Sequence, residues 1–448
     1  MEFSASQSDL ALRHAPIATL FFRYAVPTIA AMLVTGIYVA VDGMFVGHIL
    51  GEEGLASIMV GYPLASILYA TGNLVGMGAA ALVSMALGQN NVKAARVYVG
   101  NAVSYSLLLS VITGLAGYCL HVPVLKALGA SGNILYQASE YLSLYFVLGG
   151  FAVVTMALSP LVRNDGKPNL VTAIMILGGL LNIVLDWLFM VAIPWGLRGA
   201  ALATMLSQAV TALLCLKHFL SGESRLKLSL DTLVLQGRNI VEITRLGFSS
   251  FLMYLYLTVV LTLHNAFFLA IGTPLHVAAY AVVSYSEAFF YLIFEGIALG
   301  MQPITSFNSG AGETLRVRAA RNTALSVTLL FALLSVVVIY SFPEFIIWAF
   351  SGDNEILRPV ALHGIQLYFW GLPMEGLLLV GAVYFQSIGQ ASAASILTGG
   401  KLILIGAVMY ILSVWFGTDG VWLALPVTST FLATWMIFHL YRLSKMYH

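Results

Sequence analysis

Asp42 lies inside a long apolar stretch that has no Lys or Arg close to it in the sequence. The nearest cationic side chains are Arg23 before it and Lys126 after it, and His48 is the only titratable neighbour of opposite sign. A carboxylate that faces lipid within a membrane helix costs about 2.5–3.5 kcal/mol. A chain that keeps such a residue usually needs it, so the groups that Asp42 faces decide what it does.

Two other polar residues are predicted to lie at the depth of Asp42. A helix rises about 1.5 Å per residue, which places Asp42 about 28 Å beyond Arg23 and Asp186 about 27 Å beyond Pro168, both measured from the inner face. Thr204 lies about 10 Å from the outer end of its helix by the same rise. All three side chains are therefore expected in the outer half of the membrane.

Asn182 and Tyr38 add to this group, because they precede Asp186 and Asp42 by four residues and so share their helix faces. Two buried carboxylates without a nearby cation cannot both ionise cheaply, since burial penalises each charge and the two charges repel. Such a group, with Thr204, can take up a proton near neutral pH or bind a small hard cation such as Na⁺ through its oxygens. The alternative is a polar cluster that only ties helices together.

A second set of polar residues is expected within the apolar runs of the second half of the chain: His264, Glu287, Glu295, Glu375 and Lys401. Glu375 and Lys401 lie at depths that agree within about 3 Å. They are therefore predicted to form a buried ion pair. That pair can be purely structural, because buried ions are usually paired whatever their role.

Pro27 lies early in the first apolar run, before Asp42. A proline inside a helix removes a backbone hydrogen bond and invites a bend. We therefore consider Pro27 a hinge that lets the Asp42 segment move. The alternative is a static kink, which membrane helices commonly tolerate.

The composition is that of a polytopic membrane protein. Of the 448 residues, 60% are hydrophobic and 9% are charged, whereas a soluble domain has about 25% charged residues. The net charge of +1 and the lack of a basic run exclude a nucleic-acid partner. The sequence motifs of hydrolases, metalloproteases and ATPases are absent. We expect no enzyme activity and no cofactor, and any energy must come from an ion gradient.

Apolar runs separated by polar and Gly/Pro breaks predict twelve transmembrane helices. They are expected at 17–48, 54–88, 95–118, 134–163, 168–193, 197–219, 240–271, 275–310, 316–341, 358–387, 391–415 and 419–442. Sixteen of the 20 Lys and Arg residues then fall on the side of the two termini, and Lys401 lies within a helix. Three fall on the other side, namely Lys126, Arg198 and Arg358. This bias predicts a multi-pass protein of the inner (plasma) membrane with both termini in the cytoplasm.

The two halves of the chain resemble each other when shifted by about 222 residues. Under this shift Gly78 falls on Gly300, Asp42 on His264 and Asp186 in the region of Met409, so the second half does not repeat the Asp42–Asp186 pair. Each half holds six predicted helices, so the repeat is parallel and its two-fold axis runs along the membrane normal. The predicted units are an N-lobe at 1–220, a cytoplasmic linker at 221–239 and a C-lobe at 240–448.

Seven motifs resemble those of the multidrug and toxic compound extrusion (MATE) transporters, and most of all their MepA-like bacterial branch. They are YVAVDGMFVGHILGEEGLA (38–56), GMGAAALVSMALGQNN (76–91), RNDGKPN (163–169), LNIVLDWLF (181–189), GLRGAALATMLSQ (196–208), GIALGMQPITSFNSGAG (296–312) and YFQSIGQ (384–390). The resemblance covers roughly residues 20–440. It implies twelve helices in two pseudo-symmetric six-helix lobes and export of cationic or amphipathic drugs in exchange for H⁺ or Na⁺.

The resemblance also assigns roles to individual residues. It maps the family's bending proline onto Pro27, and its N-lobe cation site onto the residues grouped above by depth and spacing: Asp42, Asn182, Asp186 and Thr204. Some members carry an acidic residue on the seventh helix, where this chain has His264 and Asn265. A C-lobe ion site of that kind is therefore in doubt, and the correspondence of Glu295 and Glu375 to family positions is weaker.

The sequence favours a secondary transporter that works by alternating access as a monomer in the bilayer. Protons are preferred over Na⁺ as the coupling ion, because two unpaired carboxylates in apolar surroundings are natural proton acceptors. The main alternative is a flippase or exporter for lipid-linked oligosaccharides or other lipid precursors. It would need a cavity rich in Arg and Lys for phosphate groups, whereas only Lys401 is expected deep in the membrane.

Overall fold

The computed structural model describes residues 7–222, 224–352 and 354–446, and within them the chain forms helices and loops without a strand. The start of the polar N-terminal stretch, at 1–6, lies outside the described residues. The first half holds α1 (Gln7–His14), α2 (Ile17–Gly88), α3 (Val92–Ala127), α4 (Gly132–Leu148), α5 (Gly150–Asn164), α6 (Pro168–Asp186), η1 (Trp187–Ala192) and α7 (Leu197–Leu220). The second half holds η2 (Leu230–Leu233), α8 (Gly237–Ile271), α9 (Pro274–Gly310), α10 (Thr314–Ser341), α11 (Pro343–Ser351), α12 (Arg358–Tyr368), η3 (Phe369–Gly371), α13 (Leu372–Ser387), α14 (Ala391–Phe416) and α15 (Thr418–Met446).

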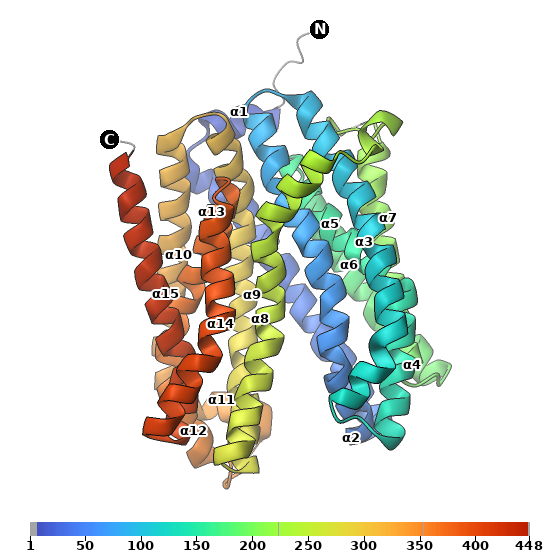
Figure 1. Ribbon diagram of the computed structural model, residues 1–448, viewed down its shortest axis with the longest axis vertical. Helices are drawn as coiled ribbons and strands as arrows, with labels where there is room; N and C mark the ends of the chain where they lie inside the picture. Colours follow the sequence, from blue (N-terminus) through green and yellow to red (C-terminus); the bar gives the residue numbers. More distant parts are fainter. Residues whose placement is uncertain (1–6, 223, 353, 447–448) are drawn as a thin grey trace.

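Helix α2 is two membrane spans joined at Gly51. Its 72 residues would extend about 108 Å as one straight helix, far more than the roughly 30 Å of a bilayer core. Gly51 breaks the helix with φ 65° and ψ −156°, a conformation that glycine adopts without a steric penalty. In Figure 1 α2 reverses direction at the end of the molecule opposite the two termini.

The structure is an all-α membrane protein, as predicted. Ten of the described helices are long and apolar enough to span a bilayer, and α4 with α5, bent by 53°, makes an eleventh span. Because α2 turns at Gly51, the described chain crosses twelve times. The element bounds differ from the prediction where a glycine or a short irregular turn interrupts an apolar run. The predicted helix 134–163 breaks at Gly149, and 358–387 is interrupted by η3.

Two groups of helices are visible in Figure 1, with α3–α7 on one side, α8–α15 on the other, and both chain ends at the same end of the molecule. They meet where glycines allow backbones to touch. A Cβ on Gly88 would lie 2.0 Å from the carbonyl oxygen of Phe307, and one on Gly310 would lie 2.0 Å from that of Met85. These contacts exchange under the shift of about 222 residues. A two-fold relation between the halves requires such an exchange, while the lobe boundaries themselves stay a prediction.

A buried ionic network ties the loop after α7 to the end of α5. Asp165 accepts hydrogen bonds from His218 Nε2 (2.8 Å), Ser224 Oγ (2.8 Å) and Arg225 Nε (3.1 Å). Arg225 also pairs with Asp9, in the first turn of α1. Since the Asp165 side chain is only 2% exposed, these partners supply the hydrogen bonds that water would otherwise make.

Replacing Asp165 with Asn is expected to free the 221–239 segment. The substitution removes the ionic half of a buried cluster, and breaking such a pair costs about 3–5 kcal/mol. Trypsin should then cleave after Arg225 or Lys227 faster than in the wild-type protein, as measured by the rate of appearance of two half-chains. Asp419→Asn is the control, because the His363–Asp419 pair is 53% and 45% exposed. Equal cleavage rates in all three proteins would show that the network does not hold this segment.

Candidate functional site

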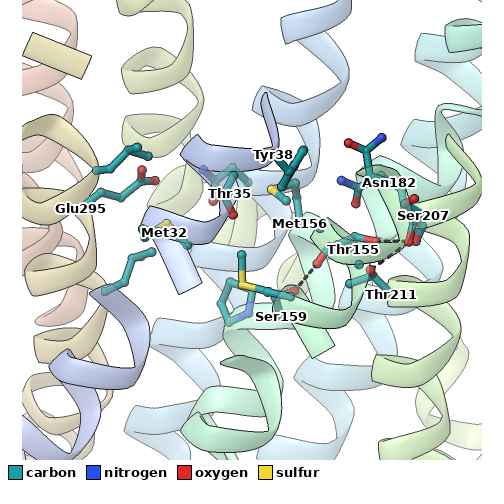
Figure 2. A pocket seen from close by; sticks show the side chains of 18 of the residues that line it. Met32, Thr35, Tyr38, Thr155, Met156, Ser159, Asn182, Ser207, Thr211 and Glu295 are labelled. Atoms are coloured by element: carbon teal, nitrogen blue, oxygen red, sulfur yellow. Dashed lines mark hydrogen bonds between the residues drawn. The ribbon is translucent and has the colours of Figure 1, made fainter. Parts of the chain in front are cut away.

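A cavity of about 900 Å³, including its opening, lies among α2, α5, α6, α7, α8 and α9. In Figure 2 Met32, Thr35 and Tyr38 of α2 stand between Glu295 of α9 on one side and the polar side chains of α6 and α7 on the other. The wall mixes methionines with small polar residues: Met32, Thr35, Tyr38, Asn73, Thr155, Met156, Ser159, Met175, Asn182, Thr204, Ser207, Gln208 and Thr211. Such a wall suits amphipathic organic molecules, because methionine adapts its shape and the hydroxyls and amides supply hydrogen bonds.

The structure brings together polar residues that the sequence groups by depth. Asn182 Nδ2 donates to Thr204 Oγ1 at 3.3 Å, across the α6–α7 contact. Asn182, Asp186 and Thr204 are all buried, with Asp186 fully so. Asp42, on α2, is half-buried and close enough to Asp186 for the two carboxylate charges to interact.

Several oxygens of this group have no hydrogen-bond partner. They are Asp42 Oδ1, Asn182 Oδ1 and both carboxyl oxygens of Asp186. An acceptor left unpaired in a buried site costs free energy unless a proton or cation satisfies it. Helix α6 also changes to a π-helix directly after Asp186, and such single-turn π segments often mark functional sites. The group therefore has the donor set that a proton or a small hard cation would need.

Tyr38 connects this group to the cavity. Its ring packs against α6 where Gly179 leaves room, since a Cβ there would lie 3.1 Å from Tyr38 Cδ1. Tyr38, Asn182 and Thr204 line the cavity, whereas Asp42 and Asp186 are outside the lining, one helical turn from Tyr38 and Asn182. Binding of a proton or cation at Asp42 or Asp186 can therefore alter the cavity wall through a single turn of helix.

Pro27 lies in α2 where the structure gives it a neighbour on α6. Thr172 Oγ1 donates to the Pro27 carbonyl oxygen at 2.9 Å, as well as to that of Pro168 at 3.1 Å. Any bend at Pro27 has to break or shift the first of these bonds. The hinge role itself stays a prediction.

The buried Glu375–Lys401 ion pair is present between α13 and α14. Ser429 of α15 also donates to Glu375, and Lys401 Nζ lies 3.8 Å from the centre of the Tyr256 ring. The pair is therefore satisfied by a hydroxyl, an ion partner and an aromatic face. Such a fully partnered cluster favours a structural role for this pair.

Glu287 lines a small cavity with Glu375, and Tyr368 contacts both Glu287 and His264. Tyr368 Oη donates to Glu287 at 2.5 Å, and the His264 ring stacks on Tyr280 with 4.4 Å between ring centres. The Nδ1 of His264 is 2.9 Å from the Val260 carbonyl oxygen. Since a carbonyl only accepts, this nitrogen carries a proton.

Glu295 is separated from the other acidic residues of the second half and lines the cavity instead. Arg163, which is 2% exposed, lines the same cavity. Because Arg163 is the penultimate residue of α5, its burial by other parts of the protein does not place it deep in the membrane. The two residues are the only charged side chains that line the cavity within the described part of the chain.

A periodic signal in the sequence could have revealed these polar walls. Thr155, Ser159 and Arg163 recur every four residues along α5, and Thr204, Gln208 and Thr211 recur every three or four along α7. Residues at that spacing share one helix face. An apolar helix with one such polar stripe is expected to face a cavity or another helix rather than lipid.

Comparison with known families identifies the architecture. A family model described as MatE matches residues 27–188 and 248–412, more than half of the chain. The chain belongs to the MATE family. Among curated MATE relatives, the multidrug export protein MepA of Staphylococcus saprophyticus is 25% identical over 427 residues, which are 94% of this chain and 93% of that protein. MepA of Staphylococcus aureus is 23% identical over 429 residues, covering 95% and 94%.

Solved MATE structures have the same fold. The structure described as the outward-facing conformation of a multidrug resistance MATE family transporter of the MOP superfamily superposes with a TM-score of 0.90. It is 22% identical to this chain and covers 99% of each. MATE transporters are secondary transporters, so this protein is not an enzyme. No cluster of three or more His, Cys, Asp or Glu side chains able to hold a metal occurs among the residues described.

Proposed function

We propose that this MATE-family multidrug efflux transporter exports cationic and amphipathic drugs across the plasma membrane in exchange for protons. The observation that supports it most is the set of buried oxygens without partners at Asp42, Asn182 and Asp186. A proton bound there removes buried charge and satisfies an acceptor, so binding it stabilises one packing of the helices. The MepA relatives are multidrug export proteins, which supports the drug-like class of substrate.

Coupling would follow from side chains that belong to both sites. Tyr38, Asn182 and Thr204 line the drug cavity and stand within one turn of the carboxylates or bond within their group. A drug that moves these side chains changes the environment of Asp42 and Asp186. By thermodynamic linkage, a drug that lowers proton affinity is itself bound less tightly when the protons are present.

Sodium is the competing coupling ion. Four oxygen-bearing side chains can surround a small cation: Asp42, Asn182, Asp186 and Thr204. We prefer protons because none of the ion pairs among the described residues includes Asp42 or Asp186, and a carboxyl group without a cationic partner readily binds a proton.

Adding a cationic dye such as ethidium to the purified protein in weak buffer is expected to release protons. The measurement is the absorbance change of a pH indicator, made with and without Na⁺. A double variant, Asp42→Asn with Asp186→Asn, is the control and should bind dye without releasing protons. Sodium-dependent dye binding without any proton release in the wild-type protein would contradict proton coupling.

The orientation follows from charge. Both chain ends lie at the same end of the molecule, and sixteen of the 20 Lys and Arg residues are predicted on that side. The positive-inside rule then puts both termini in the cytoplasm. A flippase is less well supported, because a single Arg does not make the phosphate-binding wall that a lipid-linked oligosaccharide would need.

A further inference from the structure

Arg163 is a buried cation without a partner at the wall of the cavity. The residue is 2% exposed, and its Nε has no hydrogen-bond partner. None of the ion pairs among the described residues includes it. Its side chain contributes to the cavity lining. The guanidinium therefore has at least one nitrogen without a hydrogen-bond partner and no ion partner, on a side chain that lines the cavity.

The neighbours of Arg163 do not neutralise it. Asn164 directs its amide to the Pro160 carbonyl oxygen and to Gln302 (2.8 Å), and Ser159 donates to the Thr155 carbonyl oxygen (2.8 Å). A guanidinium keeps its charge in proteins, and a buried charge without a partner is costly. An anionic group entering the cavity would remove that cost.

Glu295 supplies the opposite charge without cancelling it. The charges of Arg163 and Glu295 interact, yet no ion pair joins them. In Figure 2 Glu295 lies on the α9 side of the cavity, beyond Met32 and Thr35 of α2. The cavity is thus lined by a positive group on α5 and a negative group on α9, and none of the ion pairs among the described residues joins them.

We propose that Arg163 is an anion-binding subsite of the cavity, which holds the carboxylate of amphipathic substrates whose cationic end faces Glu295. An Arg can bind a carboxylate through two parallel hydrogen bonds, which makes it selective for that group. The proposal deepens and rests on the proposed drug export. It makes Arg163 the residue that distinguishes substrates carrying a carboxylate from otherwise similar cations.

Two dyes that differ in one group test this. Rhodamine 110 carries a free carboxyl group, and rhodamine 123 is its methyl ester. Their dissociation constants for the purified full-length protein can be measured by fluorescence polarisation. Arg163→Gln is expected to weaken rhodamine 110 binding about tenfold or more, the value of one charge-assisted hydrogen bond, and to leave rhodamine 123 binding within about threefold. Arg163→Lys keeps the positive charge but cannot make the two parallel hydrogen bonds of a guanidinium. It should therefore weaken rhodamine 110 binding less than Arg163→Gln does.

Arg238→Gln is the matched control, since Arg238 is 88% exposed, and both dyes should bind it as they bind the wild type. Equal losses of both dyes in Arg163→Gln, or no loss of either, would overturn the subsite. The wild-type protein gives a second test that needs no variant, because rhodamine 110 binding tenfold weaker than rhodamine 123 binding would also overturn it. A wild-type protein that binds neither dye would instead count against the proposed function and remove the basis of this inference.

Discussion

Cells that produce the Asp42→Asn variant are expected to retain a cationic dye as cells without the transporter do. An amide has nearly the size of a carboxyl group but cannot take up and release a proton, so the variant should fold and yet lose coupling. Asp42 lies outside the cavity lining, so the purified variant should still bind dye. The measurement is the rate of rhodamine 123 efflux from loaded cells, normalised to the amount of protein in the membrane.

Asp231→Asn is the control for this experiment, because Asp231 is an exposed carboxylate in the segment between α7 and α8. It should export dye at the wild-type rate. If Asp42→Asn and the wild type export dye equally well, Asp42 serves only the structure. In that case the proposed coupling through the Asp42–Asp186 group is wrong.

Replacing Glu375 with Gln is expected to cause a large loss of stability. The Lys401 side chain is only 9% exposed, and the substitution removes its ion partner. Removing one member of a buried pair costs about 3–5 kcal/mol. Thermal unfolding in detergent can be followed with a thiol-reactive dye, because Cys215 is buried whereas Cys119 is exposed. A Cys119→Ser background leaves one reporting thiol.

A double variant separates the charge effect from packing. Glu375→Gln combined with Lys401→Met removes both charges, and replacing a whole buried pair with uncharged groups is often nearly neutral. The double variant should therefore unfold at a higher temperature than Glu375→Gln alone. If the double variant is the less stable of the two, the pair does not act through its charges.

The sequence predicts the common depth of Asp42 and Asp186 because a helix in lipid rises regularly along its axis. Counting residues from Arg23 and Pro168 places Asp42 and Asp186 at one depth, and the structure puts their charges within interaction range. The same arithmetic predicts the Glu375–Lys401 pair, which is present. The depth of a residue in the membrane depends only on its distance along its own helix, so it can be read from one segment of the sequence.

Which helix faces which is a different property, and it depends on packing. The sequence groups Glu295 with Glu287 and Glu375, whereas the structure turns Glu295 toward the cavity and away from them. The rotation of α9 about its own axis decides which of its residues face the cavity. Close contacts set that rotation, such as that of Gly296 with Ile29, where a Cβ on Gly296 would lie 2.7 Å from the Ile29 Cα. The sequence pattern of one helix does not specify how that helix is rotated against its neighbours.

The sequence by itself therefore determined the membrane class, the spans and the level of the buried charges, because hydrophobicity and helical rise act along one chain segment at a time. Only the tertiary structure decided that Arg163 and Glu295 share a cavity and that Tyr38, Asn182 and Thr204 line the same one. These neighbours come from α2, α5, α6, α7 and α9. Their meeting depends on how glycine contacts bring separate helices together, and that depends on the whole packed bundle.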